Sequence, residues 1–218
     1  MTVVVPTLRI ERELLREHPI VIACDEVGRG ALAGPVAVGA AVVDARAVGE
    51  GMPEGLRDSK LIAEPRRPLV AVRAAAWTTA SAIGWADAAE IDRIGIVRAL
   101  GQAAARALEA LHEQGIDLAR AAVVLDGNHD YVSPASGRAL RVTPVVKADR
   151  DCASAAAASV LAKVARDELM RALHDDAPVY EWARNKGYAS AAHRAAIRAH
   201  GLSAHHRASW AISGADRP

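Results

Sequence analysis

Residues 19–30 read Pro-Ile-Val-Ile-Ala-Cys-Asp-Glu-Val-Gly-Arg-Gly and join an apolar segment to two acids and a glycine-rich turn. The apolar part, residues 19–24, is short and rich in β-branched side chains, which is typical of a buried strand. Asp25 and Glu26 follow it directly, and two adjacent acids at the end of a buried strand are unusual. This stretch therefore predicts a core strand that carries functional carboxylates at its end.

The flanking sequence predicts an α/β fold. Four further strands are expected at residues 36–43, 77–85, 121–125 and 140–146. Helices are expected at residues 8–17, within 66–76, at 88–112, at 153–173 and through much of the basic segment after 178, with a long connection at 44–59. The first three strands follow one another through short connections, whereas the last two follow a helix. A mixed five-stranded sheet with helices on its faces is the result.

The composition is that of a globular chain with few aromatic residues. The 218 residues are 51% hydrophobic but only 3% aromatic, so the core must be built from Ala, Val, Leu and Ile. The net charge of +1 does not indicate nucleic-acid binding by the whole molecule, and a phosphate partner would need local basic patches. No apolar run reaches the ~20 residues of a membrane span. The N-terminus lacks a signal-peptide pattern, so we expect a cytoplasmic protein with no membrane partner.

Two more acids stand at the ends of predicted strands, Asp126 after the fourth and Asp149 near the fifth. Ligands of open α/β sheets bind beyond strand ends, and carboxylates gathered there repel one another unless a cation or protons offset the repulsion. Oxygen ligands with open positions suit Mg²⁺ or Mn²⁺, and two such ions ~4 Å apart can activate water against a phosphodiester. Asp126, which precedes Gly127, also fits a turn, and Asp149 also fits a helix cap.

The adjacency of Asp25 and Glu26 constrains how they could act. Neighbouring side chains of a regular strand point to opposite faces. Both acids could serve one site only if the strand bends at this point, or if Glu26 contributes its backbone carbonyl. We therefore expect the two residues to have different roles. Cys24, which ends the apolar run, is expected to be a small core residue and not a nucleophile.

The segment from Asp25 to Gly30, followed by Ala33-Gly34-Pro35-Val36, resembles the signature of ribonuclease HII. Five further segments resemble motifs of that family, in the same order along the chain. They are Asp58-Ser59-Lys60-Leu61, Ile91-Asp92 with Ile96, Leu125-Asp126-Gly127, residues 147–149 with 156–167 (KAD and AAASVLAKVARD), and Asn185-Lys186-Gly187-Tyr188 with His193 and His206-Arg207. Two positions depart from the family pattern: Gly95, where Asn is usual, and Pro68.

The resemblance implies a ribonuclease H-like catalytic domain at residues 1–174 and a small helical extension that contacts substrate at 175–218. It implies four catalytic acids that hold Mg²⁺ or Mn²⁺, with two ions in the substrate complex: Asp25, Glu26, Asp126 and Asp149. It also implies contacts with the ribose 2′-OH and with the sugar or base at an RNA–DNA junction, made respectively by Gly28-Arg29-Gly30 and by Tyr188. Since the 2′-OH separates RNA from DNA at one site, a glycine-rich backbone turn could test it whatever the base.

Several polar side chains are candidate phosphate contacts. The candidates are Ser59, Lys60, Lys147 and Lys163, with Arg166, Lys186 and Arg207 as further possibilities. Apolar neighbours predict partial burial of Lys147 and Lys163 near the acids. Ser59 could instead hold a turn.

The expected activity is endonucleolytic hydrolysis of the RNA strand of RNA–DNA hybrids. By resemblance, cleavage also falls 5′ to ribonucleotides embedded in duplex DNA, and two-metal catalysis leaves 3′-hydroxyl and 5′-phosphate ends. The protein is expected to act as a monomer on these duplexes. Two alternatives stay open: another nuclease of this fold, of the junction-resolvase type, and a non-catalytic hybrid-binding protein. The four acids disfavour the second, because a pure binder gains nothing from clustered negative charge facing phosphate.

Overall fold

The computed structural model describes residues 5–210, so the outer ends of the two predicted domains lie outside it. Its centre is a sheet of five strands in the order β3-β2-β1-β4-β5. The strands are β1 (Ile20–Val27), β2 (Val36–Asp44), β3 (Ala80–Ala86), β4 (Ala121–Asp126) and β5 (Arg141–Val145). β1 pairs antiparallel with β2, and β2 with β3, whereas β1 pairs parallel with β4, and β4 with β5. The predicted mixed five-stranded sheet is confirmed.

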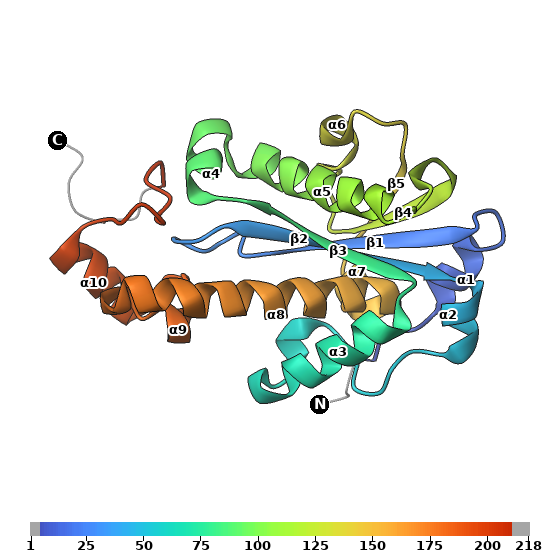
Figure 1. The fold of residues 1–218 in the computed structure, drawn as a ribbon, viewed down its shortest axis with the longest axis horizontal. Helices are drawn as coiled ribbons and strands as arrows, with labels where there is room; N and C mark the ends of the chain where they lie inside the picture. Colours follow the sequence, from blue (N-terminus) through green and yellow to red (C-terminus); the bar gives the residue numbers. More distant parts are fainter. Residues whose placement is uncertain (1–4, 211–218) are drawn as a thin grey trace.

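Long helices cover both faces of the sheet (Figure 1). α5 (Ile96–Glu113) lies on one face, and α8 (Ala153–Asp176) with α3 (Arg67–Trp77) lies on the other. The shorter helices are α1 (Arg9–Leu14), α2 (Ala45–Glu50), α4 (Ala88–Ile94), α6 (Ser133–Ser136), α7 (Ala148–Asp151), α9 (Trp182–Asn185) and α10 (Ala191–His200). Short 3₁₀ turns are η1 (Ser59–Leu61), η2 (Glu64–Arg66), η3 (Leu118–Arg120) and η4 (Pro178–Tyr180).

Small residues let the helices approach the sheet closely, which explains how a core without Phe packs. Gly39 of β2 lies against the Ala158 carbonyl of α8, and Gly84 of β3 lies against the Ala103 carbonyl of α5. A Cβ atom at either glycine would overlap the helix backbone. The first half of α8 is rich in alanine, and these small side chains are buried where the helix lies close to the sheet.

The start of α8 is stabilised from another part of the chain. Cys152 occupies the N-cap position and makes no capping side-chain bond to the helix. The buried carboxylate of Glu11, in α1, instead accepts a 2.7 Å hydrogen bond from the Ser154 amide. An acceptor at this position satisfies a free N–H of the first turn. α8 is therefore anchored at the end nearest α7, from which Asp149 projects.

Three sequence predictions need correction. The expected connection at 44–59 contains α2, which begins because the Asp44 side chain accepts a 2.9 Å bond from the Ala47 amide. The strand expected at 77–85 begins at Ala80, and Trp77 ends α3 with its indole donating to the Ala47 carbonyl at 2.8 Å. The helix expected at 88–112 is two helices, because Gly95 has a φ of +79°, which a helix cannot accommodate. A helix-like apolar period continues through such a break and does not reveal it.

α8 continues beyond the edge of the sheet, and the C-terminal part of the chain packs around its end (Figure 1). The boundary predicted at 174 falls in the last turn of α8, and α9 and α10 lie at the end of this helix. Their core is a small cluster of Ala33, Met170, Tyr180, Trp182 and Ile197. Among residues 5–210, none of the helices has the length and apolar character needed to cross a membrane.

Candidate active site

β1 places its two acids on opposite faces of the sheet. The strand runs on regularly through Val27, with Asp25 opposite Gly39 and Glu26 opposite Val38 in β2. Asp25 therefore lies on the α8 side, and Glu26 lies on the α5 side. Sequence analysis ended this strand at Cys24, so the continuation is a correction. The strand does not bend to bring both carboxylates together.

Three carboxylates meet at the end of the sheet. Oxygen atoms of Asp25, Asp126 and Asp149 all lie within 4.8 Å of one another. Asp126 ends β4, which is parallel to β1, and Asp149 lies in α7 just after β5. The Asp149 amide donates to Asp126 Oδ1 at 3.3 Å, which ties the second and third acids together. Both aspartates thus belong to a cluster, although Asp126 also accepts a bond in the way of a turn residue.

Burial and mutual repulsion disfavour the charged forms of the clustered carboxylates. Burial raises the pKa of Asp25 well above its ordinary value, and the neighbouring carboxylates raise it further, against a hydrogen bond from Ser159. Burial and Asp149 likewise raise the pKa of Asp126. Lys60 supplies partial compensation, because its Nζ lies 3.2 Å from Asp149 Oδ2. Burial opposes the charge on Lys60, but Asp58 and Asp149 outweigh it and raise the pKa of this ammonium.

Glu26 has its own partners on the other side of β1. The buried Tyr131 hydroxyl donates to Glu26 Oε2 at 3.2 Å, and Arg29 Nη1 lies 3.5 Å from Oε1. Sequence analysis missed Tyr131, which follows Asp126 by only five residues but carries no motif. Its one signal was a lone aromatic residue in a polar loop.

A cleft of about 210 Å³ opens beside Asp25 and Glu26. It is lined by most of the predicted substrate contacts, namely Gly28, Arg29, Gly30, Ser59, Lys60, Lys163 and Tyr188. Lys163 is partly buried as expected, and its Nζ pairs with Asp167 at 2.7 Å. Lys147 is exposed and does not line the cleft, so its predicted burial is wrong. It stands in the left-handed backbone region with a φ of +61°, where the chain turns into α7.

Two buried arginines hold the glycine-rich turn. Arg207 donates to the carbonyls of Gly28 and Arg29 at 2.7 and 2.8 Å. Arg166 donates to those of Pro35 and Lys186, each at 2.9 Å. Both guanidinium groups are fully buried, so they are not available to phosphate, contrary to the sequence expectation. Arg207 holds the turn itself, and Arg166 holds the segments beside it.

Gly28 is suited to this arrangement. Its φ is +85°, a conformation that favours glycine. The space that a Cβ atom would occupy is filled by the Arg166 guanidinium. The first glycine of the turn is therefore required by the fold, whereas Gly30 has open space around it.

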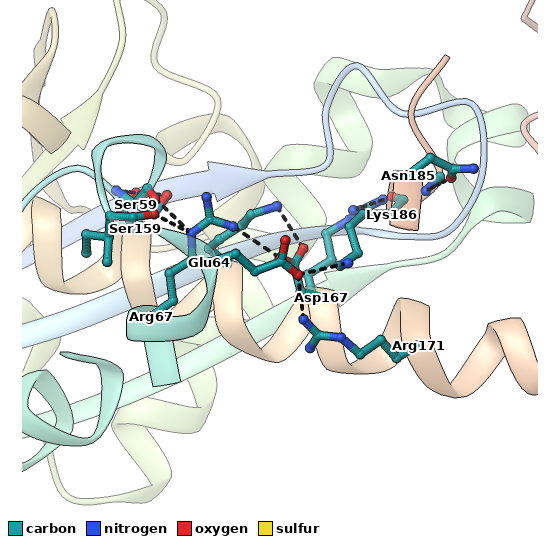
Figure 2. A network of polar contacts seen from close by, with 12 residues as sticks. Ser59, Glu64, Arg67, Ser159, Asp167, Arg171, Asn185 and Lys186 are labelled. Atoms are coloured by element: carbon teal, nitrogen blue, oxygen red, sulfur yellow. Dashed lines mark hydrogen bonds and ion pairs between the residues drawn. The ribbon is translucent and has the colours of Figure 1, made fainter. Parts of the chain in front are cut away.

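A polar network joins the cleft to the C-terminal part (Figure 2). The hydroxyl oxygens of Ser159 and Ser59 lie 3.0 Å apart, and Arg67 Nε donates to the Ser59 carbonyl at 3.0 Å. Arg67 also lies 3.6 Å from Asp167. On the far side of the network, the buried Lys186 pairs with Glu64 at 3.1 Å. Ser59 thus holds a turn and also lines the cleft, while Lys186 serves the fold.

Tyr188 and Cys24 lie in contrasting settings. The Tyr188 side chain is 37% exposed at the cleft, and its ring centroid lies 5.5 Å from Arg166 Cζ. Cys24 is fully buried, and burial raises the pKa of its thiol to about 12. A thiol in this state is a core residue, as expected, and not a nucleophile.

The chain matches the family model described as Ribonuclease HII over residues 22–213. A ribonuclease HII of Streptomyces avermitilis is 43% identical over 208 residues, covering 94% of this chain and 84% of the relative. One of Roseobacter denitrificans is 41% identical, covering 86% and 87%. The crystal structure of ribonuclease H2 from Pyrococcus horikoshii OT3 has a TM-score of 0.70 at 22% identity, covering 88% of this chain and 94% of that one. Bst-RNase HIII in complex with Mn²⁺ has the same score and identity, with coverages of 95% and 71%. The expected ribonuclease H-like fold is confirmed.

Proposed function

Because the chain belongs to the ribonuclease HII family, we propose that this ribonuclease hydrolyses the RNA strand of RNA–DNA hybrids and cuts 5′ to ribonucleotides embedded in duplex DNA. The observation that carries the proposal is one cleft in which the Asp25 carboxylate, the Gly28–Gly30 turn and the Tyr188 ring lie together. The carboxylate belongs to the reaction, and the turn and ring belong to recognition of the sugar.

The carboxylate cluster fits hard divalent cations. It offers oxygen donors alone, from Asp25, Asp126 and Asp149, and Mg²⁺ and Mn²⁺ prefer such ligands. Burial, and after it the neighbouring carboxylates, raise the pKa values of Asp25 and Asp126, and a bound cation would favour their charged forms. When bound as a pair, such ions supply an activated water and stabilise the departing 3′-oxygen, leaving 3′-hydroxyl and 5′-phosphate ends.

Glu26 would act differently from Asp25. Its side chain lies on the α5 side of β1 and accepts a hydrogen bond from Tyr131, so we infer that Glu26 would contribute its backbone carbonyl to the ion site. Two adjacent acids can serve one site if the strand bends or if one of them contributes its backbone carbonyl. Because β1 is regular, the second possibility applies to Glu26. Glu26 remains in the proposed set of four catalytic acids, with a separate role.

The substrate contacts follow from the lining of the cleft. Backbone groups of the Gly28–Gly30 turn, made rigid by Arg207, would hydrogen-bond the 2′-OH whatever the base. Tyr188 would stack against the sugar or base at the RNA–DNA junction. Lys60 and Lys163 are the cleft ammonium groups for phosphate, and the exposed Lys147 could only meet the duplex outside the cleft. One chain supplies the whole cleft, so we propose a monomer in which residues 175–218 form the extension that contacts substrate.

A cleavage assay tests the proposal. A DNA duplex with one ribonucleotide and its all-DNA version are compared with Mg²⁺ or Mn²⁺, and the cut position is mapped. We expect cleavage of the first substrate alone, on the 5′ side of the ribonucleotide. Cleavage of both duplexes would favour a nuclease of the junction-resolvase type, and binding without cleavage would favour a hybrid-binding protein. Asp25→Asn should keep its fold and lose activity by orders of magnitude.

A further inference from the structure

Two buried histidines lie next to the backbone of Tyr188, and one of them contacts the Tyr188 carbonyl. His193 comes from α10 and His206 from the loop that follows it, and their Nε2 atoms are 3.1 Å apart. Both side chains are buried, with exposed fractions of 0% and 3%. The rings of Tyr180 and Trp182 pack around them. The pair lies outside the carboxylate cluster, so the proposed chemistry makes no use of it.

The hydrogen-bond partners determine where each proton lies. The Ser203 amide can only donate, and it donates to His206 Nδ1 at 2.9 Å, so this nitrogen carries no hydrogen. The Trp182 indole can only donate, and it donates to His193 Nε2 at 3.1 Å. The Nε2–H of His206 then points at the same His193 nitrogen, whose single lone pair is shared between the two donors. Both imidazoles are therefore neutral, each in a single tautomer.

The chain of donors ends on the backbone of Tyr188. With its Nε2 accepting, His193 carries its hydrogen on Nδ1, which donates to the Tyr188 carbonyl at 2.9 Å. The Ser190 amide donates to the same carbonyl at 2.8 Å. Two hydrogen bonds to this carbonyl fix the orientation of the peptide group after Tyr188. The position of the Tyr188 ring depends on that backbone conformation.

We propose that His193, held in one tautomer by His206, is a positioning residue that sets the Tyr188 ring in the substrate cleft. The inference rests on the proposed function, because it assumes that Tyr188 meets the sugar at the RNA–DNA junction. A simple packing role would need only the shape of the two rings. The proposed role needs the Nδ1–H of His193, the side-chain donor to the Tyr188 carbonyl.

Matched substitutions separate these roles. In His193→Asn the amide nitrogen can replace Nδ1 as donor to Tyr188, whereas His193→Leu removes every polar contact of the side chain. His206→Asn keeps an acceptor for Ser203 and loses the bond to His193. Each variant is made in the wild-type and Tyr188→Ala backgrounds, with melting temperatures measured alongside. kcat and KM are then determined on the one-ribonucleotide duplex.

We expect His193→Leu to lower kcat/KM roughly three- to tenfold, the effect of one lost hydrogen bond. His193→Asn should recover most of that loss, and neither change should matter once Tyr188 is Ala. An equal loss in the Tyr188→Ala background, or an Asn variant no better than Leu, would overturn the inference. If the Leu variant does not fold, His206→Asn gives the same test with a smaller expected loss. Failure of the proposed function would appear separately, as a wild-type protein that leaves this duplex uncut.

Discussion

The carboxylate cluster should destabilise the protein when no cation is present. Charges 4.8 Å apart, the limiting oxygen separation within the cluster, repel by about 3.5 kcal/mol at an effective dielectric constant of ~20. Asp25 faces two such partners, and Lys60, which lies 3.2 Å from Asp149, offsets part of the repulsion. Burial and the neighbouring carboxylates both raise the pKa of Asp25, so its charged form is disfavoured when no cation is present. We therefore expect Asp25→Asn to stabilise the metal-free protein by about 2 kcal/mol, which corresponds to roughly 4–8 °C in Tm for a chain of this size.

Thermal melts in EDTA and during a Mn²⁺ titration measure this effect. Asp25→Asn should melt higher than wild type in EDTA and should gain much less from Mn²⁺, because one ligand is lost. Asp175→Asn is the matched control, since it makes the same change of charge at an exposed site near the end of α8. It should leave both the metal-free Tm and the Mn²⁺ response unchanged. A lower Tm for Asp25→Asn in EDTA, together with an unchanged Mn²⁺ response, would refute the reasoning.

Three further predictions concern Tyr131, the glycine-rich turn and His206. Tyr131→Phe frees the Glu26 carboxylate from its 3.2 Å bond and should lower kcat about fivefold with little change in Tm; an unchanged kcat would remove Tyr131 from the site. Gly28→Ala should cost several kcal/mol in denaturant melts, because its φ is +85° and the Cβ position is filled, whereas Gly30→Ala has open space and should cost under about 1 kcal/mol. Burial and neighbouring histidines lower the pKa of His206 to about 4, so the unfolded chain binds a proton below about 6.5 that the folded chain refuses. Stability should therefore fall by about 2–3 kcal/mol as pH drops from 6.5 to 4, and His206→Asn should flatten that slope. The titratable groups around His206 are His193, His205 and Tyr180.

The strands were predictable because each is a short apolar run bounded by turn residues. The wrong predictions for individual residues share one cause. A local sequence pattern does not reveal the tertiary contacts of a residue. Trp77 has a strand-like neighbourhood, yet it ends α3 because its indole reaches the Ala47 carbonyl. Lys147 has apolar neighbours, yet it is exposed because the chain turns there through a positive φ. Resemblance located the motifs but could not show these environments.

The buried arginines show the same limit at the site itself. A sequence containing Arg166 and Arg207 near catalytic motifs suggests phosphate binding, since arginine suits that role. In the fold, both guanidinium groups donate to carbonyls of the turn and of the adjoining segments, and neither reaches the cleft. Whether a basic residue meets substrate or scaffold depends on burial, which arises from the packing of α8 against the C-terminal part.

Asp25 and Glu26 show where the reasoning from sequence was sufficient and where it stopped. Strand alternation alone predicted two roles for the pair, and the regular pairing of β1 with β2 confirms the opposite faces. Strand alternation could not predict the hydrogen-bond partner of Glu26, because Tyr131 belongs to the loop after β4. The two sides of one strand thus carry separate parts of the site, an acid cluster under α8 and a tyrosine-held glutamate under α5. The two sides are still coupled by charge, because the Glu26 carboxylate contributes to the raised pKa of Asp25 and accepts the Tyr131 hydrogen bond. The effects of Asp25→Asn and Tyr131→Phe on Tm should therefore depart from additivity, and the double variant measures the coupling.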